Sequence, residues 1–430
     1  MHILKDFGVT KYVGKLKNGT RVVLFHKPST PILTNALFKA GSRFDPKGKE
    51  GLAHFGEHVM FKKTEKFKSE NDVSKFIESL GGEINAYTWV DGLGVEVEIA
   101  TASDFEKSAV FVNELVQRSM FTKEQVDIER GVVLREINDQ NSNPGWYIYT
   151  LAYTLMLQDT DAGRPVLGTH KTVRSIDYED LKHYYKTLIN PDDMTLIISG
   201  GVELGEVIDT YNNKFDLGEI DKKSKVERTI LEINRKEEIR IEKYTDTEQV
   251  HLSLGFRTAP IYSHDSDALS VIRVILGHGM SSSLFRKLRT ESGLVYSVEV
   301  KNSCSSDYGN FYIFSSTSKK DVNKVIKIIV SECNRMTKGD IQPNELLLAK
   351  DKIIKSKTRE LQTSLSWVVQ HYLDELYCPD TATDVADWMN RIEKVSIEDI
   401  ARVAKKYFKP GSWYLALCGD IEEKDVVVDY

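Results

Sequence analysis

The sequence has few cysteines and no long apolar run, and both absences limit what the chain can be. It has 4 cysteines in 430 residues and no C-x-x-C pair, which excludes a thiolate zinc site and a thioredoxin-like motif. We expect the thiols to be reduced and mostly buried. No apolar stretch approaches the roughly 18–20 residues of a membrane span, and the N-terminus lacks the apolar core of a signal peptide. We therefore expect no membrane partner and a cytoplasmic location, or an organellar matrix if a transit peptide has been removed.

Basic residues are also scarce relative to acidic ones. The chain has 58 Lys and Arg against 64 Asp and Glu, a formal net charge of −6. A general nucleic-acid binder needs a basic surplus, so we expect no nucleic-acid partner. Hydrophobic residues make up 41% and charged residues 28%, as in globular proteins, which excludes wholesale disorder. The length allows two or three domains.

The chain contains an internal repeat with a period near half its length. The pattern over 81–115 predicts a strand pair followed by a helix, and 293–333 repeats that order about 215 residues later. The longer helical stretches 121–157 and 341–376 match at an offset of 220. Each half then closes with an amphipathic helix, a proline-containing turn and an apolar strand. Because these blocks match in the same order in both halves, they indicate a duplication.

The repeat predicts an α+β protein of two homologous domains, each an antiparallel sheet with helices packed on one side. We predict the first domain over residues 1–215 and the second over 239–430. The stretch 216–238 is charged and weakly periodic, which is typical of an interdomain linker.

The motif with the clearest chemistry lies in the first half. His54, Glu57 and His58 form an H-x-x-E-H pattern in the run AHFGEHV. Helix residues at i and i+4 lie one turn apart on one face, so both imidazoles can reach a single metal ion. Zn²⁺ lowers the pKa of bound water to about 7, and Glu57 would accept the proton as the water attacks a carbonyl. The simpler alternative is a surface helix that carries two histidines by chance.

A zinc site of this kind needs a third protein ligand, and the predicted helix over 121–140 offers two. Glu129 and Glu136 are seven residues apart, two helical turns, so they share a face. At the 220-residue offset the second half has Ala349 and Ser356, and it has no H-x-x-E-H pattern. The two carboxylates are therefore present only in the half that carries the histidine pair, which links them to that pair rather than to the fold that both halves share. Either glutamate alone is most simply a solvated charge, and spacing does not decide between them.

Four segments together resemble the pitrilysin/insulinase family of metallopeptidases. They are GSRFDPKGKEGLAHFGEHVMFKKT, GGEINAYT, ERGVVLREI and LFRKLRTESGLVYSV. The H-x-x-E-H pattern is the inverted zinc motif. The resemblance covers essentially the whole chain. It is closest to the half-size branch that includes bacterial processing-type peptidases and the mitochondrial processing peptidase subunits.

The resemblance implies a role for each polar residue of the first half. It makes His54, His58 and Glu136 the ligands of one Zn²⁺ per chain and Glu57 the general base. It makes Glu129 a supporting residue or auxiliary acid.

Two residues of the second half also match a family pattern. Arg289 and Tyr296 correspond to the family's R-x6-Y pair, which implies that they hold the substrate carbonyl and stabilise the oxyanion. A guanidinium and a phenol O–H both donate hydrogen bonds to developing negative charge. From the residues alone, a surface arginine and a core tyrosine explain them more simply.

The segment Asn85-Ala86-Tyr87-Thr88 matches the family's substrate-binding edge strand. A peptide can add to such an edge as an extra strand, held by backbone hydrogen bonds. The resemblance therefore implies substrate binding by Asn85, Ala86 and Thr88. The alternative is a plain sheet strand.

The sequence departs from the family pattern at three places. Position 56 is glycine where the family has a bulky apolar residue, and a glycine inside a helix costs about 1 kcal/mol relative to alanine. Gly94 predicts a bulge or a weakened strand. The stretch 276–280 is short, unlike the long glycine-rich loop of the processing peptidase's partner subunit.

A run of basic residues follows the H-x-x-E-H motif and is most simply a solvated helix end. It comprises Lys62, Lys63, Lys66 and Lys68.

Taken together, these features predict a zinc endopeptidase that hydrolyses peptides or unfolded protein segments inside a clamshell chamber. Full-length family members carry four such domains and this chain carries two. Because it has both the zinc motif and the Arg/Tyr pair, we expect a homodimer. Two alternatives remain: a non-catalytic peptide-binding or scaffold subunit of the same fold, or the catalytic subunit of a heterodimer.

Overall fold

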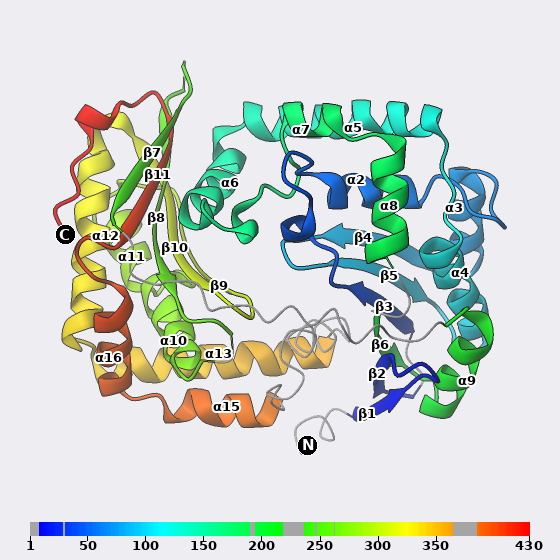
Figure 1. Cartoon of the computed structure of the whole chain (residues 1–430). Coiled ribbons are helices and arrows are strands. Elements are labelled where there is room, and N and C mark those ends of the chain that lie inside the picture. Colours follow the sequence, from blue (N-terminus) through cyan, green and yellow to red (C-terminus); the bar gives the residue numbers. More distant parts are fainter. Residues whose placement is uncertain are drawn as a thin grey trace. The chain divides into compact units, whose positions relative to one another are not determined.

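The computed structural model describes most of the chain, which forms two compact units (Figure 1). Unit 1 contains the described residues up to 139, those of 159–217 and 361–363, and unit 2 contains 140–158 and the other described residues from 236 onward. The described ranges are 8–28, 31–189, 194–217, 236–245, 247–261, 263–363 and 385–430.

Unit 1 is built on a six-stranded sheet in the order β1-β2-β6-β3-β5-β4. Every neighbouring pair is antiparallel except β2 and β6, which are parallel. Alternate residues of each strand, such as Val22 and Leu24, point into a core shared with helices on one face of the sheet. The strands are β1 (Thr10–Lys15), β2 (Arg21–His26), β3 (Ile32–Phe38), β4 (Glu83–Thr88), β5 (Leu93–Ile99) and β6 (Thr195–Gly200).

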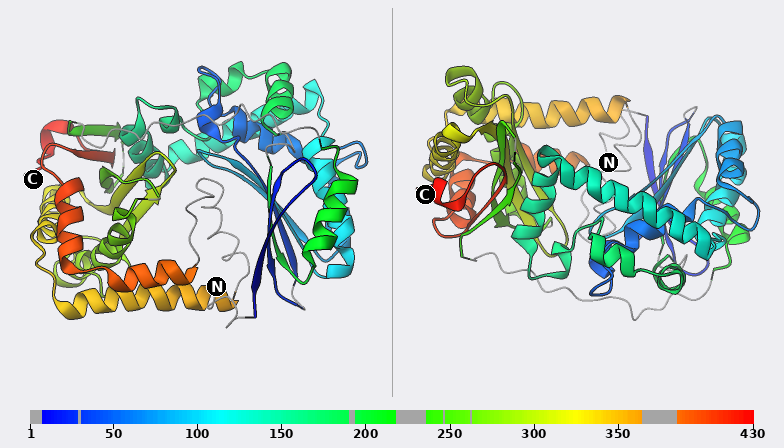
Figure 2. Two further views of the ribbon diagram at one scale, coloured as in Figure 1. Left: turned by 60° about the horizontal axis from the view of Figure 1, so that its bottom comes forward. Right: turned by 90° about the horizontal axis from the view of Figure 1, so that it is seen from above.

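The helices of unit 1 supply the other side of this core, and Figure 2 shows several of them along one face of the sheet. They are α2 (Leu52–Met60), α3 (Glu70–Ser79), α4 (Phe105–Gln117), α5 (Lys123–Ser142), α7 (His170–Ser175), α8 (Tyr178–Leu188) and α9 (Leu204–Lys214). Short 3-10 turns are η1 (Ser42–Phe44), η2 (Ala102–Asp104) and η3 (Asp161–Gly163).

Unit 2 repeats this plan with a five-stranded sheet in the order β7-β11-β8-β10-β9, in which β7 and β11 are the parallel pair. The strands are β7 (Glu238–Lys243), β8 (Gln249–Thr258), β9 (Val298–Cys304), β10 (Gly309–Ser318) and β11 (Trp413–Gly419). The helices are α10 (Asp265–Gly277), α11 (Ser283–Phe285), α12 (Val322–Lys338), α13 (Pro343–Thr363), α15 (Val385–Lys394) and α16 (Ile397–Tyr407). A π-helical turn, η6 (Arg286–Glu291), and two 3-10 turns, η7 (Lys319–Asp321) and η8 (Glu423–Asp425), complete the unit.

Helix α6 (Pro144–Leu157) covers the second face of the sheet of unit 2, although it precedes that sheet by some 80 residues. Its buried residues recur at helical spacing, for example Ile148, Leu151 and Leu155. They pack against the strand residues that point away from the other core, such as Tyr312 and Tyr414. The sheet of unit 2 is therefore covered on both faces.

The predicted α+β fold class with two related units is confirmed, with two corrections. The predicted strand pair and helix appear as β4, β5 and α4, and again as β9, β10 and α12. The sheets were predicted to be antiparallel, and every pair of neighbouring strands is so except one parallel pair in each sheet. The prediction of helices on one side is wrong for unit 2, because α6 lies on the opposite face. The predicted first domain, 1–215, included this helix, which packs in unit 2.

Three further predictions concern the linker, the thiols and the membrane. Most of the predicted linker 216–238 lies outside the described residues. Cys333 and Cys418 are buried free thiols and Cys304 is a partly exposed one, while Cys378 lies outside the described residues. In the described part of the chain, no helix has the length and apolar character that crossing a membrane requires.

Helix α2, which carries the H-x-x-E-H pattern, is fixed at its start by a buried carboxylate. Asp45 accepts hydrogen bonds from the backbone N–H groups of Gly51, Leu52 and Ala53, at 2.8, 3.2 and 2.9 Å. These donors have no partner within the helix, and the positive end of the helix dipole favours a carboxylate there.

The middle of α2 is fixed by a buried tyrosine. The ring of Tyr184, on α8, lies against Gly56, and a Cβ at position 56 would come within 2.7 Å of it. The Tyr184 hydroxyl donates a hydrogen bond to the backbone carbonyl of Ala40. Glycine at position 56 is therefore required by the size of Tyr184, and the missing side chain leaves no gap.

The strand at Gly94 is regular, so the predicted bulge is wrong. The register between β4 and β5 is continuous, with Tyr87 opposite Gly94. The Tyr87 ring covers the glycine, since a Cβ there would lie 2.6 Å from it. The ring also stacks on Trp89, and the hydroxyl donates to Asn35 at 2.7 Å. An aromatic side chain thus compensates for the glycine, as in other sheets.

The match between Gly56 and Tyr184 can be tested by exchanging their sizes. Gly56→Leu should destabilise the protein by about 1–3 kcal/mol through overpacking, and Tyr184→Ala should destabilise it by leaving a cavity. The double variant should be more stable than Tyr184→Ala alone, because the leucine refills part of the cavity. Thermal unfolding followed by circular dichroism measures all three.

Gly131→Ala on α5 is the matched control for this experiment. A Cβ at position 131 meets nothing closer than the end of Arg135, at 3.6 Å, so alanine should stabilise the helix by about 1 kcal/mol. Purely additive effects of Gly56→Leu and Tyr184→Ala would contradict the proposed fit.

Candidate metal centre

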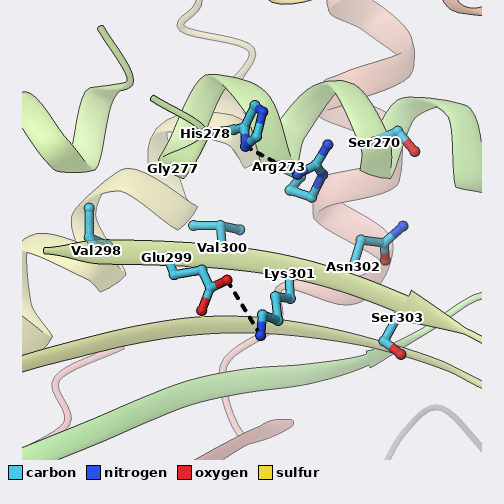
Figure 3. A pocket seen from close by; sticks show the side chains of 10 residues that line it. All are labelled: Ser270, Arg273, Gly277, His278, Val298, Glu299, Val300, Lys301, Asn302 and Ser303. Atoms are coloured by element: carbon cyan, nitrogen blue, oxygen red, sulfur yellow. Dashed lines mark hydrogen bonds and ion pairs between the residues drawn. The ribbon is translucent and has the colours of Figure 1, made fainter. Parts of the chain in front are cut away.

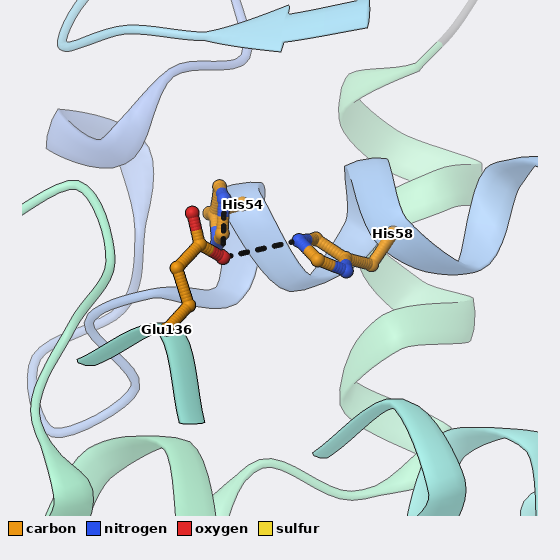
Figure 4. A group of neighbouring side chains, drawn as sticks. All are labelled: His54, His58 and Glu136. Atoms are coloured by element: carbon orange, nitrogen blue, oxygen red, sulfur yellow. Dashed lines mark ion pairs between the residues drawn. The ribbon is translucent and has the colours of Figure 1, made fainter. Parts of the chain in front are cut away.

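Two helices of unit 1 bring three possible metal ligands together (Figure 4). His54 and His58 come from α2, and Glu136 comes from α5. The carboxylate oxygen Oε2 of Glu136 lies 3.6 Å from Nε2 of His54 and 3.5 Å from Nε2 of His58. Both imidazoles therefore direct the same ring nitrogen toward one carboxylate oxygen.

This donor set fits a zinc ion in both chemistry and spacing. Imidazole nitrogen and carboxylate oxygen are ordinary zinc ligands, and three protein ligands leave one position open, as catalytic sites require. Ligand atoms about 2.0–2.1 Å from a tetrahedral ion are about 3.3–3.4 Å apart, close to the spacing seen here. Among the described residues, this is the group of histidine, cysteine and acidic side chains that could hold a metal ion.

The second carboxylate of α5 has a different place in the site. Glu129 is buried, and its Oε2 lies 3.3 Å from Nδ1 of His58, on the far side of that ring from Glu136. Its other oxygen, Oε1, lies 3.0 Å from the ammonium of Lys62. Spacing alone left Glu129 and Glu136 equivalent; the geometry separates them into one residue facing both Nε2 atoms and one behind His58.

Burial and mutual contacts shift the pKa values of His54, His58 and Glu136 in different directions. Burial and the neighbouring His58 lower the pKa of His54 to about 4, against the opposing effect of Glu136. Burial also lowers the pKa of His58, but the carboxylates of Glu136 and Glu129 outweigh it and raise the pKa above its ordinary value. The hydrogen bond from His58 holds the pKa of Glu136 below its usual value. His54 is thus neutral near pH 7, the form in which imidazole binds metals.

Glu57 lies one turn after His54 on the same helix but is not among the converging ligands. Burial raises its pKa, which the hydrogen bond from Thr88 opposes. The Thr88 hydroxyl donates to Oε2 of Glu57 at 2.6 Å. The last residue of β4 therefore fixes the orientation of this carboxylate, a contact that the sequence did not predict.

Strand β4, which carries Asn85, Ala86 and Thr88, is an edge strand of its sheet. Among the described residues it pairs with β5 alone. Asn85 is exposed and Ala86 is half-buried. Of the three predicted substrate-binding residues, Thr88 has its hydroxyl engaged with Glu57, and the other two lie along the unpaired side of the sheet.

In unit 2, Arg289 and Tyr296 lie next to each other. The guanidinium carbon of Arg289 is 4.6 Å from the centroid of the Tyr296 ring and 5.0 Å from that of Phe285. Arg289 belongs to the π-helical turn η6, a wide turn of the kind often found at functional sites. Tyr296 is 77% exposed. Both side chains therefore present hydrogen-bond donors to their surroundings.

A cavity of about 730 Å³ lies in unit 2 between the C-terminal half of α10 and the edge strand β9 (Figure 3). Arg273 and His278 line it from the helix side, and their side chains approach to 3.5 Å. Residues 298–303 of β9 line the other side. The strand was predicted from the sequence but the cavity was not, because a single basic residue such as Arg273 on an amphipathic helix does not indicate one.

Comparison with known protein families matches the two halves of the chain to two different family models. Residues 21–170 match the family described as "Insulinase (Peptidase family M16)", and residues 175–353 match "Peptidase M16 inactive domain". The first segment contains the three converging ligands and Glu57. The chain belongs to peptidase family M16. The name of the second M16 segment agrees with the lack of an H-x-x-E-H pattern in that half.

Several M16 relatives are similar over nearly the full length of the chain. An "uncharacterized zinc protease" of Rickettsia felis is 27% identical over 406 residues, which are 92% of this chain and 94% of that protein. A second protein of that name, from Streptomyces coelicolor, is 28% identical over 399 residues, 91% and 85% of the two chains. The mitochondrial-processing peptidase subunit beta of Mus musculus is 25% identical over 415 residues, 95% and 84% of the two chains.

Solved structures show the same M16 fold. A crystal structure of a protease from Helicobacter pylori matches with a TM-score of 0.88 at 21% identity, covering 96% of this chain and 99% of that one. A peptidase M16 inactive domain from Pseudomonas fluorescens matches with a TM-score of 0.87 at 16% identity, covering 96% and 98%.

The candidate ligand set predicts which variants lose zinc and which keep it. His54→Ala, His58→Ala and Glu136→Gln should each lose stoichiometric zinc, because two ligands do not hold the ion. Glu57→Gln should keep about one zinc per chain, since it lies outside the ligand set. Glu129→Gln should keep zinc but bind it about 10–100-fold more weakly, because an orienting partner of a ligand is lost. Elemental analysis after dialysis and chelator competition measure both quantities. Full zinc retention by Glu136→Gln would contradict the ligand set.

Proposed function

We propose that this chain is a zinc-dependent endopeptidase that hydrolyses peptides or unfolded protein segments and binds one Zn²⁺ per chain. The observation that carries the proposal is the convergence of His54, His58 and Glu136, with the Glu57 carboxylate beside them. The zinc-protease names of full-length relatives support the same reaction.

In the proposed peptide hydrolysis, the metal and Glu57 have different roles. When bound by His54, His58 and Glu136, Zn²⁺ supplies Lewis acidity, which acidifies a water molecule and polarises a peptide carbonyl. Glu57 is the general base: its carboxylate takes a proton from the attacking water and returns it to the leaving amine. Burial raises the pKa of Glu57, which brings it closer to the pKa range in which proton transfer near neutral pH is efficient.

Thr88 holds the base in place during these steps. Its hydroxyl donates to one oxygen of Glu57 at 2.6 Å, which leaves the other oxygen for the water. A side chain restrained in this way loses less entropy when the reacting geometry forms.

The substrate in this proposal adds to the edge strand β4. Backbone groups along Asn85 and Ala86 form hydrogen bonds with an extended peptide, which explains recognition with little regard to side chains. The unpaired side of β4 among the described residues supports this role. A folded protein cannot present an extended backbone, so we expect a preference for unfolded segments.

Arg289 and Tyr296 complete the proposed site by donating hydrogen bonds to the substrate carbonyl. Their adjacency and exposure in unit 2 support a shared role. In our proposal two chains form a clamshell homodimer, and the pair of one chain serves the zinc of the other. The presence of both the zinc motif and the Arg/Tyr pair in a two-unit chain motivates this arrangement.

Two other readings compete with the homodimer peptidase. The chain could be a non-catalytic scaffold, in which case it would purify without stoichiometric zinc and chelators would change nothing measurable. It could instead be the catalytic subunit of a heterodimer, a reading favoured by the relative named as a processing-peptidase subunit beta.

Digestion of a mixed peptide library tests the reaction. Wild type should cut flexible peptides and leave a stably folded domain intact, while Glu57→Gln should be slower by about 10²–10⁴-fold because the general base is lost. Chelator should abolish cleavage and added Zn²⁺ should restore it, as read by mass spectrometry. Equal digestion by wild type and Glu57→Gln would contradict the assignment of Glu57 as the general base. Equal digestion of folded and unfolded substrates would contradict the proposal of an enclosed chamber.

Complementation between inactive chains tests the homodimer. Chains carrying Glu57→Gln are mixed with chains carrying Arg289→Ala and Tyr296→Phe, each inactive by itself. If the pair acts on the partner's zinc, a mixed dimer contains one complete site and should recover up to half of the wild-type activity per dimer. Subunit mixing is verified with differently tagged chains. No recovery in proven mixed dimers would exclude action between chains.

A further inference from the structure

Lys62 does not behave as the solvated lysine that the sequence suggested. Its side chain is 17% exposed and lies between two carboxylates. The ammonium is 3.0 Å from Oε1 of Glu129 and 2.9 Å from Oε2 of Glu70. Its neighbour Lys63 has no ion pair among the described residues, so the two adjacent lysines differ sharply in environment.

Glu129 depends on this lysine for its charge balance. Its side chain is 8% exposed, and a buried carboxylate without a counter-charge is strongly unfavourable. Within the described part of the chain, Lys62 is the only lysine or arginine that forms an ion pair with Glu129. The two oxygens of Glu129 are divided between the Lys62 ammonium and Nδ1 of His58.

The contact between Glu129 and His58 sets which ring nitrogen of His58 is free to bind a metal. The Glu129 carboxylate accepts a hydrogen bond from Nδ1 of His58, so that Nε2 is the ring nitrogen directed at Glu136. His54 has no such partner: its Nδ1 is buried without a hydrogen bond among the described residues. Only one of the two imidazoles is therefore held by a carboxylate.

We infer that Lys62 is a positioning residue for the metal site, which acts through Glu129 on His58. Lys62 holds the Glu129 carboxylate in position against Nδ1, and Glu129 in turn holds the His58 ring with Nε2 toward His54 and Glu136. This inference rests on the proposed zinc site. Glu70, on the far side of Lys62, restrains the ammonium without contacting His58.

Zinc affinity, measured by competition with a chromophoric chelator, tests the inference without any assay of hydrolysis. Lys62→Met should bind Zn²⁺ about 10–100-fold more weakly than wild type, the effect of losing an orienting partner. Lys62→Arg, which keeps the charge, should recover most of the affinity. Lys63→Met is the matched control and should bind as wild type does. If Lys62→Met does not fold, Lys62→Gln removes the charge while keeping a polar end and is read in the same way.

A double-variant cycle shows whether Lys62 acts through Glu129. In a Glu129→Gln background, Lys62→Met should cause little further loss of zinc affinity, because the path to His58 is already broken. Additive losses would overturn the inference, as would wild-type affinity in Lys62→Met and Lys62→Gln or equal loss in Lys63→Met.

The same measurements separate this inference from the proposed function. Tight zinc binding by wild type with no loss in the Lys62 variants overturns the positioning role and leaves the peptidase standing. Tight zinc binding with the expected losses, in a chain that cleaves no peptide, supports the positioning role and overturns the peptidase. A wild type that binds no Zn²⁺ overturns both.

Discussion

Helix α2 is held at its first turn by the Asp45 carboxylate and at its middle by the Tyr184 ring, and the metal centre depends on both contacts. The three backbone N–H donors fix where the helix begins and how it is rotated. The ring against Gly56 then fixes how closely the helix approaches α8. In this position of the helix, His54 and His58 face Glu136 of α5. A shift of a few tenths of an ångström in α2 would move both imidazoles at once, because they share one rigid backbone.

The environment of each carboxylate separates groups that are chemically identical. Glu136 lies 3.6 and 3.5 Å from the Nε2 atoms of the two imidazoles, and the hydrogen bond from His58 holds its pKa low, which suits a ligand that must stay ionised. Burial raises the pKa of Glu57 more than the hydrogen bonds from Thr88 and the nearby His58 lower it, which suits a base that must carry a proton for part of the cycle. Glu129 is paired with Lys62 and serves as an acceptor for His58. The surroundings of Glu57 and Glu136 thus shift their pKa values in opposite directions, which is typical of two carboxylates with different roles in one site.

The sequence was sufficient for features that depend on local pattern. Strand alternation and helical spacing located the repeated strand pairs and long helices, and the i, i+4 histidines located the site. Features that depend on contacts distant in sequence were missed. The packing of α6 on unit 2 has no local signal, because an amphipathic helix does not specify which sheet it covers. The fit of Gly56 to Tyr184 joins residues 128 positions apart, so the glycine looked like a weakness. Lys62 belongs to a basic run of a kind that is usually solvated, and only the positions of Glu70 and Glu129 in the structure distinguish it from Lys63.

The two units share one fold but differ in the charged residues that they bury, and a comparison of matching positions explains why both are stable. At the position that matches Glu129, unit 2 has Ala349, which is buried in its core. A small apolar residue there needs no counter-charge, so the unit requires no equivalent of Lys62 and no imidazole to satisfy the carboxylate. In unit 1 the same helix position is stable only as part of the set Lys62, Glu129 and His58. The buried charges of the metal centre therefore form an interdependent group. Losing one member leaves the others unfavourably buried, whereas replacing all of them with apolar residues yields an ordinary core.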